Sequence, residues 1–268
     1  MSPQSAKTIR FTKASACGND FLIIAGAEVS DDLSALTRRL CDRHNGIGAD
    51  GVEWLFPDSE ADVTARLINA DGSEAEVSGN GTRCVAAEIV SQSEKSKVVV
   101  RTGAGLKTCQ LIDAWGPAYE FESAMGGAIV GEQLTITAES LRIAGTRVST
   151  GNPHFVIFVE NFPEHWQRQA ALVQAQPEFP QGTNVEYVIV RGPGEIEIRL
   201  FERGVGETMS SGTGSCASAV VAIASGRVAS PVTVVAPGGA QTVRWEKQEN
   251  QVYLRGPATL VCRGEFFV

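Results

Sequence analysis

The chain has few of the residues and patterns on which several common protein classes depend. It has only three histidines in 268 residues, which are too few and too scattered for a metal site built from histidine. The six cysteines show no CxxC pair, and no apolar run reaches the 18 residues of a membrane span. The N-terminus lacks the apolar stretch of a secretory signal. These absences favour a cytoplasmic protein with reduced thiols, no metal and no membrane segment.

Basic clusters are missing as well. The formal net charge is −8, and the 23 Lys and Arg residues form no block of the kind that binds nucleic acid, so no nucleic-acid partner is expected. A small-molecule ligand is compatible with this charge, because a local pocket can differ in sign from the whole protein. The hydrophobic fraction of 43% and the length predict a globular chain of two domains.

What the sequence does contain is an internal repeat. The segment 66–81 resembles the segment 199–214, at a constant offset of 133 residues. Two shorter blocks, at 18–19 and 52–54, recur at the same offset. Because the three blocks keep their order, we interpret the chain as two copies of one unit.

Local patterns predict both strands and helices. Short β-branched or aromatic runs predict strands at 21–24, 98–100, 155–159, 187–190, 196–200 and 232–235. Helices are predicted at 33–43, 164–174, 82–90 and 215–225. The last helix is apolar or small on every face, so protein must surround it.

These elements predict an α+β fold of two pseudo-symmetric domains, each a curled, barrel-like, mixed or antiparallel sheet around a central helix. The N-terminal half is expected at 1–116, joined by a C-terminal strand at 258–268. The C-terminal half is expected at 117–257, with the crossover near 114–120.

A small glycine loop precedes the central helix of each half. Gly79-Asn80-Gly81 and Gly212-Thr213-Gly214 would expose backbone N–H groups that attract a carboxylate or phosphate. No Lys follows the glycines, and their spacing differs from that of a dinucleotide fingerprint. One such loop is as often a simple tight turn, but two loops in register favour a binding role.

Ser78 and Ser211 stand directly before these loops. If the halves face each other, the two serines flank the carbon next to a bound carboxylate. Removing a proton on one face of that carbon and returning one on the other inverts it. The pattern therefore suits a two-base racemase or epimerase that acts beside a carboxylate.

Six sequence blocks together resemble the diaminopimelate epimerase family, in family order from about Phe11 to the C-terminus. They lie at 18–21, 42–51, 69–74, 151–154, 184–186 and 202–208. The resemblance implies a cofactor-independent enzyme that interconverts LL- and meso-2,6-diaminopimelate on the bacterial route to lysine and the cell wall. It also implies two pseudo-symmetric halves, each a curled sheet around a helix, and a homodimer.

The resemblance further assigns roles to individual residues. The catalytic positions are Ser78 and Ser211, assisted by His154 and Glu202. The substrate-binding positions are Asn19, Asn69, Gly79, Asn80, Asn152, Asn184, Glu202, Arg203, Gly212 and Thr213. An isolated asparagine is more often a turn or cap residue, but Asn19 and Asn152 gain weight because they repeat.

Both catalytic positions depart from the family pattern, which has cysteine where this chain has Ser78 and Ser211. A serine hydroxyl is a far weaker acid than a thiol and acts as a base only when another group activates it. We expect the exchange to remove most proton-transfer power, since each positioned acid or base contributes about 10²–10⁴ in rate. Either both residues were engineered, or the chain binds but turns over slowly, or it catalyses related chemistry.

Other functions of the same superfamily remain as alternatives. Proline racemases and hydroxyproline epimerases typically carry His in the first loop, where Asn80 stands here. Related dehydratases usually keep one catalytic cysteine, and phenazine-pathway isomerases lack the block at 69–74. A non-catalytic amino-acid-binding homologue is a further alternative. Cys84 and Cys216 inside the helices, and Cys17 before the first repeated block, are interpreted as packing residues.

Overall fold

A computed structural model describes residues 7–26, 29, 32–139 and 141–268. It divides the chain into two compact units: unit 1 is Met1–Ser123 with Gly256–Val268, and unit 2 is Ala124–Arg255. The strands β8 (Ala118–Gly126) and β17 (Gln251–Phe267) run through the two boundaries. Because both boundaries between the units fall inside regular strands, the chain passes from one unit to the other without a separate linker segment.

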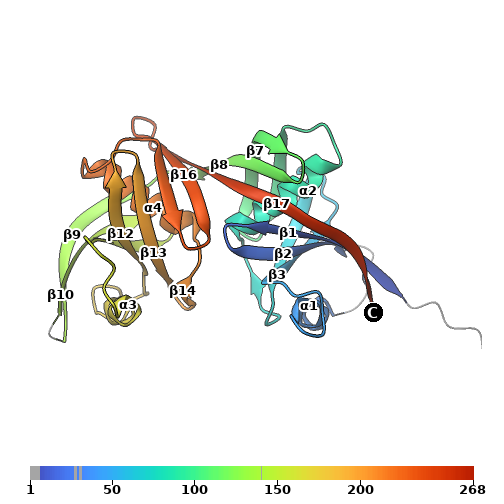
Figure 1. Cartoon of the computed structure of the whole chain (residues 1–268), viewed down its shortest axis with the longest axis horizontal. Helices are drawn as coiled ribbons and strands as arrows, with labels where there is room; N and C mark the ends of the chain where they lie inside the picture. Colours follow the sequence, from blue (N-terminus) through green and yellow to red (C-terminus); the bar gives the residue numbers. More distant parts are fainter. Residues whose placement is uncertain (1–6, 27–28, 30–31, 140) are drawn as a thin grey trace, which may run out of the picture. The chain divides into compact units, whose positions relative to one another are not determined.

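Unit 1 is a curled mixed sheet around one helix. Its elements are β1 (Thr8–Ala16), β2 (Asn19–Ala25), α1 (Leu33–Cys41), β3 (Gly51–Phe56), β4 (Val63–Asn69), β5 (Glu74–Ala75), α2 (Gly79–Ser91), β6 (Lys97–Thr102) and β7 (Gly105–Trp115), followed by parts of β8 and β17. The pairs β2–β3 and β4–β6 are parallel, and the other pairs are antiparallel. The helix α2 packs against β1, β2, β4, β6 and β7 (Figure 1).

Unit 2 has the same plan. Its elements are β9 (Ile129–Ala138), β10 (Leu141–Ser149), β11 (Pro153–Phe158), α3 (Trp166–Gln174), β12 (Asn184–Gly192), β13 (Glu195–Glu202), β14 (Gly206–Thr208), α4 (Gly212–Ala224), β15 (Val232–Ala236) and β16 (Gly239–Glu246). The pairs β11–β12 and β13–β15 are parallel. Figure 1 shows α4 surrounded by the strands of this unit, with α3 outside them.

The two units repeat each other element by element. Both α2 and α4 have 13 residues, both α1 and α3 have nine, and each pair starts 133 positions apart. The strands β1 and β10 obey the same offset at both ends. The parallel pairs also recur, β2–β3 as β11–β12 and β4–β6 as β13–β15. The predicted α+β fold of two pseudo-symmetric halves is therefore confirmed.

Each unit has an inner and an outer apolar core. The inner core of unit 2 surrounds α4, on which Cys216, Ala217 and Val220 are fully buried. The inner core of unit 1 surrounds α2 in the same way. The outer cores lie under α1 and α3, where Trp54 and Trp166 are buried. The all-round apolar character of 215–225 thus reflects a helix enclosed by its own sheet, as predicted.

The observed elements refine several predicted boundaries. The first predicted helix ends at Cys41, because Asp42 leaves the helical region with ψ of 122°. Residues 114–120 form the hairpin between β7 and β8, and the chain leaves unit 1 between Ser123 and Ala124. In the described part of the chain, no helix is both long and apolar enough to span a membrane.

Candidate active site: two half-sites

Ser78 and Ser211 hold the same place in their units, as the N-cap residues of α2 and α4. Both have extended backbones, with φ and ψ of −123° and 124° for Ser78 and −144° and 127° for Ser211. Each Oγ accepts a hydrogen bond from a backbone N–H three residues later, from Gly81 at 3.1 Å and from Gly214 at 3.3 Å. A capping hydroxyl favours helix initiation. The predicted glycine loops are therefore the first turns of the helices themselves.

These first turns can receive an anion. They present backbone N–H groups without intrahelical acceptors at the positive end of the helix dipole. Gly79 is exposed, and a side chain there would meet no atom within 4 Å. Gly212 is more enclosed, with a Leu254 methyl 3.1 Å from the corresponding position. Both turns suit a carboxylate, and the turn of α2 is the more open.

In unit 1, the structure brings Asn19 and Asn80 together. Asn80 Nδ2 donates to Asn19 Oδ1 at 2.8 Å, and Asn19 Nδ2 donates to Asp50 Oδ2 at 3.0 Å. Arg83 donates to Asn80 Oδ1 at 2.5 Å and to the carbonyl of Pro257 at 3.2 Å. This chain of bonds fixes both amide groups beside the start of α2.

Asn69 belongs to a different network of unit 1. Its backbone N–H donates to the Ser73 carbonyl at 2.8 Å, and its Nδ2 donates to the Ser73 hydroxyl at 3.0 Å. These bonds close the turn between β4 and β5. Within the described residues, no hydrogen bond joins Asn69 to Asn19 or Ser78.

In unit 2, three predicted residues meet at the start of α4. Ser211 Oγ donates to Glu202 Oε2 at 3.2 Å and lies 3.5 Å from Thr213 Oγ1. The other oxygen of Glu202 accepts from Thr208 Oγ1 at 2.7 Å. Ser211 is buried and Glu202 is half-buried. The serine hydroxyl is thus held between a backbone donor and a carboxylate acceptor.

His154 connects a second group of residues in unit 2. Its Nε2 lies 2.9 Å from Asn152 Oδ1, and its Nδ1 lies 2.7 Å from Glu186 Oε1. Asn152 Nδ2 in turn donates to Thr213 Oγ1 at 3.5 Å. Burial raises the pKa of Glu186, and the neighbouring His154 opposes that rise. Both ring nitrogens of His154 are engaged, so this side chain orients Asn152 rather than facing outward.

Asn184 and Arg203 form a third group. Asn184 is buried, and its amide donates to the Pro153 carbonyl at 3.0 Å and accepts from the Arg203 backbone N–H at 2.9 Å. The Arg203 side chain is exposed, with Nη1 bound to the Gln181 carbonyl at 2.8 Å. Asn184 therefore positions the backbone from which the Arg203 guanidinium extends.

Two buried carboxyl groups, those of Glu53 and Glu186, were not predicted as site residues from the sequence. Glu53 and Glu186 are 3% and 1% exposed and lie beneath the first turns of α2 and α4. A Cβ atom at Gly81 would come within 2.0 Å of Glu53 Oε1, and one at Gly214 within 3.0 Å of Glu186 Oε1. Burial raises the pKa of Glu53 to about 8. The repeat of block 52–54 was the signal that could have identified them.

The cysteines do not replace the missing thiols. Cys84 and Cys216 are fully buried in the inner cores, and burial raises the pKa of Cys84 far above its ordinary value. Cys17 is also buried, with Sγ 3.8 Å from an Arg83 nitrogen. Desolvation raises the pKa of Cys17 despite that cation. Packing roles, as interpreted from the sequence, fit all three residues.

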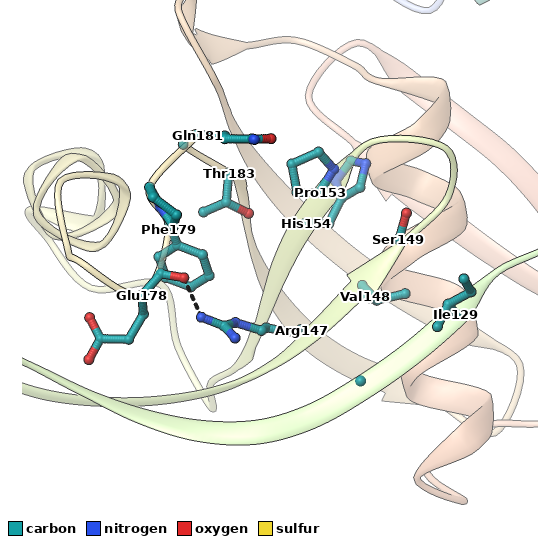
Figure 2. Close-up of a pocket in the computed structure, with 13 residues that line it drawn as sticks. Ile129, Arg147, Val148, Ser149, Pro153, His154, Glu178, Phe179, Gln181 and Thr183 are labelled. Carbon is teal, nitrogen blue, oxygen red and sulfur yellow. Dashed lines mark hydrogen bonds between the residues drawn. The ribbon is translucent and has the colours of Figure 1, made fainter.

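A cavity of about 310 Å³ lies in unit 2 beside His154 (Figure 2). Arg147 reaches across it, donates to the Glu178 carbonyl and stacks 5.1 Å from the centre of the Phe179 ring. Pro153 and Thr183 form part of its wall. The cavity therefore lies next to the group of residues that His154 connects.

Unit 1 has ion pairs at the equivalent place. Asp20 and Asp50 occupy the positions that correspond to Pro153 and Thr183, and Arg43 bridges the two carboxylates at 2.7 and 2.9 Å. Lys13 lies 2.9 Å from Asp20 as well. The two units therefore share a backbone plan, but unit 1 has charged side chains where unit 2 has a cavity.

Among the described residues, no cluster of three or more His, Cys, Asp or Glu side chains could hold a metal ion.

Comparison with known proteins identifies the family of this chain. The sequence profile of the diaminopimelate epimerase family matches residues 11–129 and 146–261. The chain belongs to the diaminopimelate epimerase family. A diaminopimelate epimerase of Desulforudis audaxviator is 40% identical over 96% of this chain and 99% of its own length. One of Desulfitobacterium hafniense is 38% identical over 96% and 97%. The chain is thus an amino-acid epimerase-like isomerase.

Solved structures share the fold of this diaminopimelate epimerase family member. A phenazine biosynthesis protein of the PhzF family from Bacillus anthracis superimposes with a TM-score of 0.71, at 16% identity, over 98% of this chain and 100% of its own. A hydroxyproline epimerase from Agrobacterium vitis, with bound trans-4-hydroxy-L-proline, gives 0.67 at 16% identity, over 98% and 92%. At these identities the likeness concerns the fold alone.

Proposed function

We propose that the chain binds 2,6-diaminopimelate and transfers protons at its α-carbon, converting the LL isomer to the meso isomer slowly and without a cofactor. The observation that carries the proposal is the matched placement of Ser78 and Ser211. Each caps a helix whose first turn can hold a carboxylate. A carboxylate held by N–H donors stabilises the negative charge that develops when the neighbouring C–H bond breaks.

The surrounding residues have distinct parts in this proposal. Asn19 and Asn80 in unit 1, and Asn152 and Thr213 in unit 2, present fixed amide and hydroxyl groups to the polar substrate. The Arg203 guanidinium, which extends into solvent from its Gln181 contact, attracts the second carboxylate of a dicarboxylic substrate. Asn69, Asn184 and His154 support this arrangement through the bonds they make.

The serines set the rate in this proposal. A cysteine at each position would carry a reactive thiolate, whereas a serine needs a neighbouring base to lose its proton. The chain therefore binds diaminopimelate normally and epimerises it slowly. We further propose a cytoplasmic enzyme that acts as a homodimer in lysine and cell-wall precursor synthesis, and light scattering would test the dimer.

The proposal is tested by calorimetry and by proton exchange in D₂O with LL-diaminopimelate. Binding is expected for the chain as it stands, together with slow α-deuteration and slow appearance of the meso isomer. The variant that combines Ser78→Cys and Ser211→Cys should epimerise far faster. If neither protein binds diaminopimelate, the substrate assignment is wrong.

A further inference from the structure

The ring of His154 is held between two oxygen atoms of unit 2. Its Nδ1 lies 2.7 Å from Glu186 Oε1, and its Nε2 lies 2.9 Å from Asn152 Oδ1. The amide oxygen of Asn152 can only accept a hydrogen bond, so Nε2 carries a hydrogen and donates it. A second hydrogen must lie between Nδ1 and Glu186, and it belongs either to the ring or to the carboxyl group.

These contacts allow two distributions of the protons. In the first, an imidazolium ring donates from both nitrogens, and Glu186 is an ionised carboxylate. In the second, Glu186 is a neutral acid that donates to Nδ1, and the ring of His154 is neutral with its hydrogen on Nε2. Both distributions hold the same number of protons, so the surroundings of the carboxyl group decide between them.

The surroundings of Glu186 favour the neutral acid. Glu186 is 1% exposed, and its second oxygen, Oε2, is buried without a hydrogen-bond partner among the described residues. An ionised carboxylate would leave negative charge on that oxygen with no donor to stabilise it, which is costly in a protein interior. Burial raises the pKa of Glu186, the ring of His154 opposes that rise, and the negative charge of Glu202 adds to it.

The cation beside this pair is engaged elsewhere. Arg147 on β10 lines the same cavity as His154. Its Nη1 donates to Glu132 at 3.2 Å, and its Nη2 donates to the Glu178 carbonyl. Arg147 therefore neutralises a carboxylate other than that of Glu186.

The hydrogen on Nε2 determines which end of the Asn152 amide faces α4. With Oδ1 on the ring, Nδ2 points to Thr213 Oγ1 at 3.5 Å. The second hydrogen of Nδ2 has no partner among the described residues and can be given to a ligand. A ring with its hydrogen on Nδ1 would instead accept at Nε2, and the amide would turn its oxygen toward the helix.

Unit 1 holds the asparagine that corresponds to Asn152 in the opposite orientation. Asn19 turns its Oδ1, not its Nδ2, toward the start of α2, where it accepts from Asn80 at 2.8 Å. The repeat offset places Phe21 where His154 stands, and a phenyl ring offers no nitrogen to an amide. Because the two units share a backbone plan, the orientation in unit 2 follows from the imidazole rather than from the fold.

We infer that Glu186 is a positioning residue: as a neutral acid it donates its proton to His154 Nδ1, and the resulting Nε2–H tautomer holds Asn152 with its amide hydrogens toward the start of α4. Glu186 acts through the two side chains between it and the helix. The consequence for binding rests on the proposed function. The half-site of unit 2 then presents N–H donors from both Asn152 and the first turn of α4, as a substrate carboxylate requires.

¹⁵N NMR of the whole chain, labelled in its histidines, tests the proton positions. Long-range couplings between ring hydrogens and ring nitrogens distinguish the two neutral tautomers from each other and from the imidazolium. The chain has only three histidines, so His44→Gln and His165→Gln each remove one signal and assign the third. We expect His154 at neutral pH to show a hydrogen on Nε2 and none on Nδ1. A hydrogen on Nδ1, alone or together with one on Nε2, would overturn the inference.

Two substitutions of Glu186 separate its role as a donor from a role in packing. In Glu186→Gln, the new amide still donates to Nδ1, so the Nε2–H tautomer should persist. Glu186→Leu removes the donor, so the ring of His154 should populate both neutral tautomers. Glu160→Leu, at an exposed position just after β11, is the matched control and should leave the His154 signals unchanged. A different tautomer in Glu186→Gln would count against a neutral acid.

Calorimetry with meso-diaminopimelate links the tautomer to binding. Glu186→Leu should weaken binding by about tenfold, since a hydrogen bond to a charged group contributes that much. Glu186→Gln should retain most of the affinity, because it retains the donor. Unchanged binding by Glu186→Leu, with its His154 signals altered, would overturn the positioning role.

The two measurements keep the inference distinct from the proposed function. If the unmodified chain does not bind diaminopimelate, the proposed substrate is wrong. The NMR spectra need no ligand, so they would still uphold or overturn the neutral state of Glu186 and the tautomer of His154.

Discussion

His154 Nδ1 lies 2.7 Å from Glu186 Oε1, and both side chains are buried in unit 2. At the same place in unit 1, Phe21 stands where His154 would be, and Glu53 replaces Glu186. One unit therefore pairs its buried carboxyl group with an imidazole, whereas in the other a phenylalanine takes the position of that imidazole. The two units thus share a backbone plan but differ in the side chain that stands next to the buried glutamate. Substitutions at these positions can test this difference.

We first predict that His154→Phe, which copies the residue of unit 1, destabilises the protein. The change leaves Glu186 buried without its partner and frees Asn152 Oδ1. A buried polar group that loses its hydrogen-bond partner costs about 1–3 kcal/mol. Urea denaturation at neutral pH would measure the loss. His165→Phe is the control, because His165 is exposed and should cost little; equal losses for both variants would contradict the prediction.

A second prediction concerns the pH dependence of stability. Because the pKa of Glu53 rises from an ordinary 4.5 to about 8 on folding, the folded chain keeps a proton that the unfolded chain releases between those values. The stabilising contribution is full below pH 4.5 and is lost as pH rises through 8. Glu53→Gln cannot lose a proton. Its stability relative to the unmodified chain should therefore rise by about 2–4 kcal/mol between pH 5 and pH 8.

Denaturant titrations at several pH values would measure this difference. Glu76→Gln is the matched control, because Glu76 is exposed and should show no comparable trend. A Glu53→Gln curve that runs parallel to that of the unmodified chain would show that Glu53 ionises normally.

The third prediction compares two glycines of the same helix turn. A Cβ atom at Gly81 would fall 2.0 Å from Glu53 Oε1, whereas one at Gly79 would meet nothing within 4 Å. Gly81→Ala should therefore destabilise by about 1–3 kcal/mol, as overpacking does. Gly79→Ala should be neutral or stabilise by up to about 1 kcal/mol, since alanine favours the helix. Thermal unfolding of both variants would decide, and a larger loss for Gly79→Ala would contradict the assigned geometry.

The fourth prediction is a gain of activity. Combining Ser78→Cys with Ser211→Cys places a thiol at each helix N-terminus, where its pKa falls and a reactive thiolate forms. The rate of conversion of LL- to meso-diaminopimelate should rise by at least about 10²-fold. Chiral chromatography of the product mixture would measure the rate. The stability of the double variant should stay close to that of the unmodified chain, so an inactive but folded double variant would count against the assigned positions.

Much of the fold could be predicted from local sequence. The helix 215–225 was identified by small and apolar residues on every face, which is possible only when a sheet encloses it. The six predicted strands are all present, because β-branched runs between turns form strands. Strands such as β9 were missed because its exposed face carries polar residues and only part of it is buried. The alternation of apolar and polar residues along the sequence does not by itself reveal such strands.

The candidate site could be predicted only in part. The serines and the glycine turns were found through the repeat, whereas the role of His154 depends on its contact with Glu186, 32 residues away in the chain. The hydrogen bond of Ser211 to Glu202 and that of Asn69 to Ser73 were also invisible in the sequence. Such contacts form between strands and loops that are far apart in the chain, and a local pattern does not identify which of them meet.

The sequence alone determined the duplication, the two capped helix starts and the family, because these depend on residue identity and spacing along the chain. Only the tertiary structure decided which carboxyl group faces which partner, since burial and distance arise when distant strands pair. The same serine at the same helix position therefore donates to a carboxylate in one unit, whereas in the other unit the corresponding side chain, Asn69, is bound to Ser73. That difference comes from the side chain at the end of β4 or β13, which packing brings beside it or holds in its own turn.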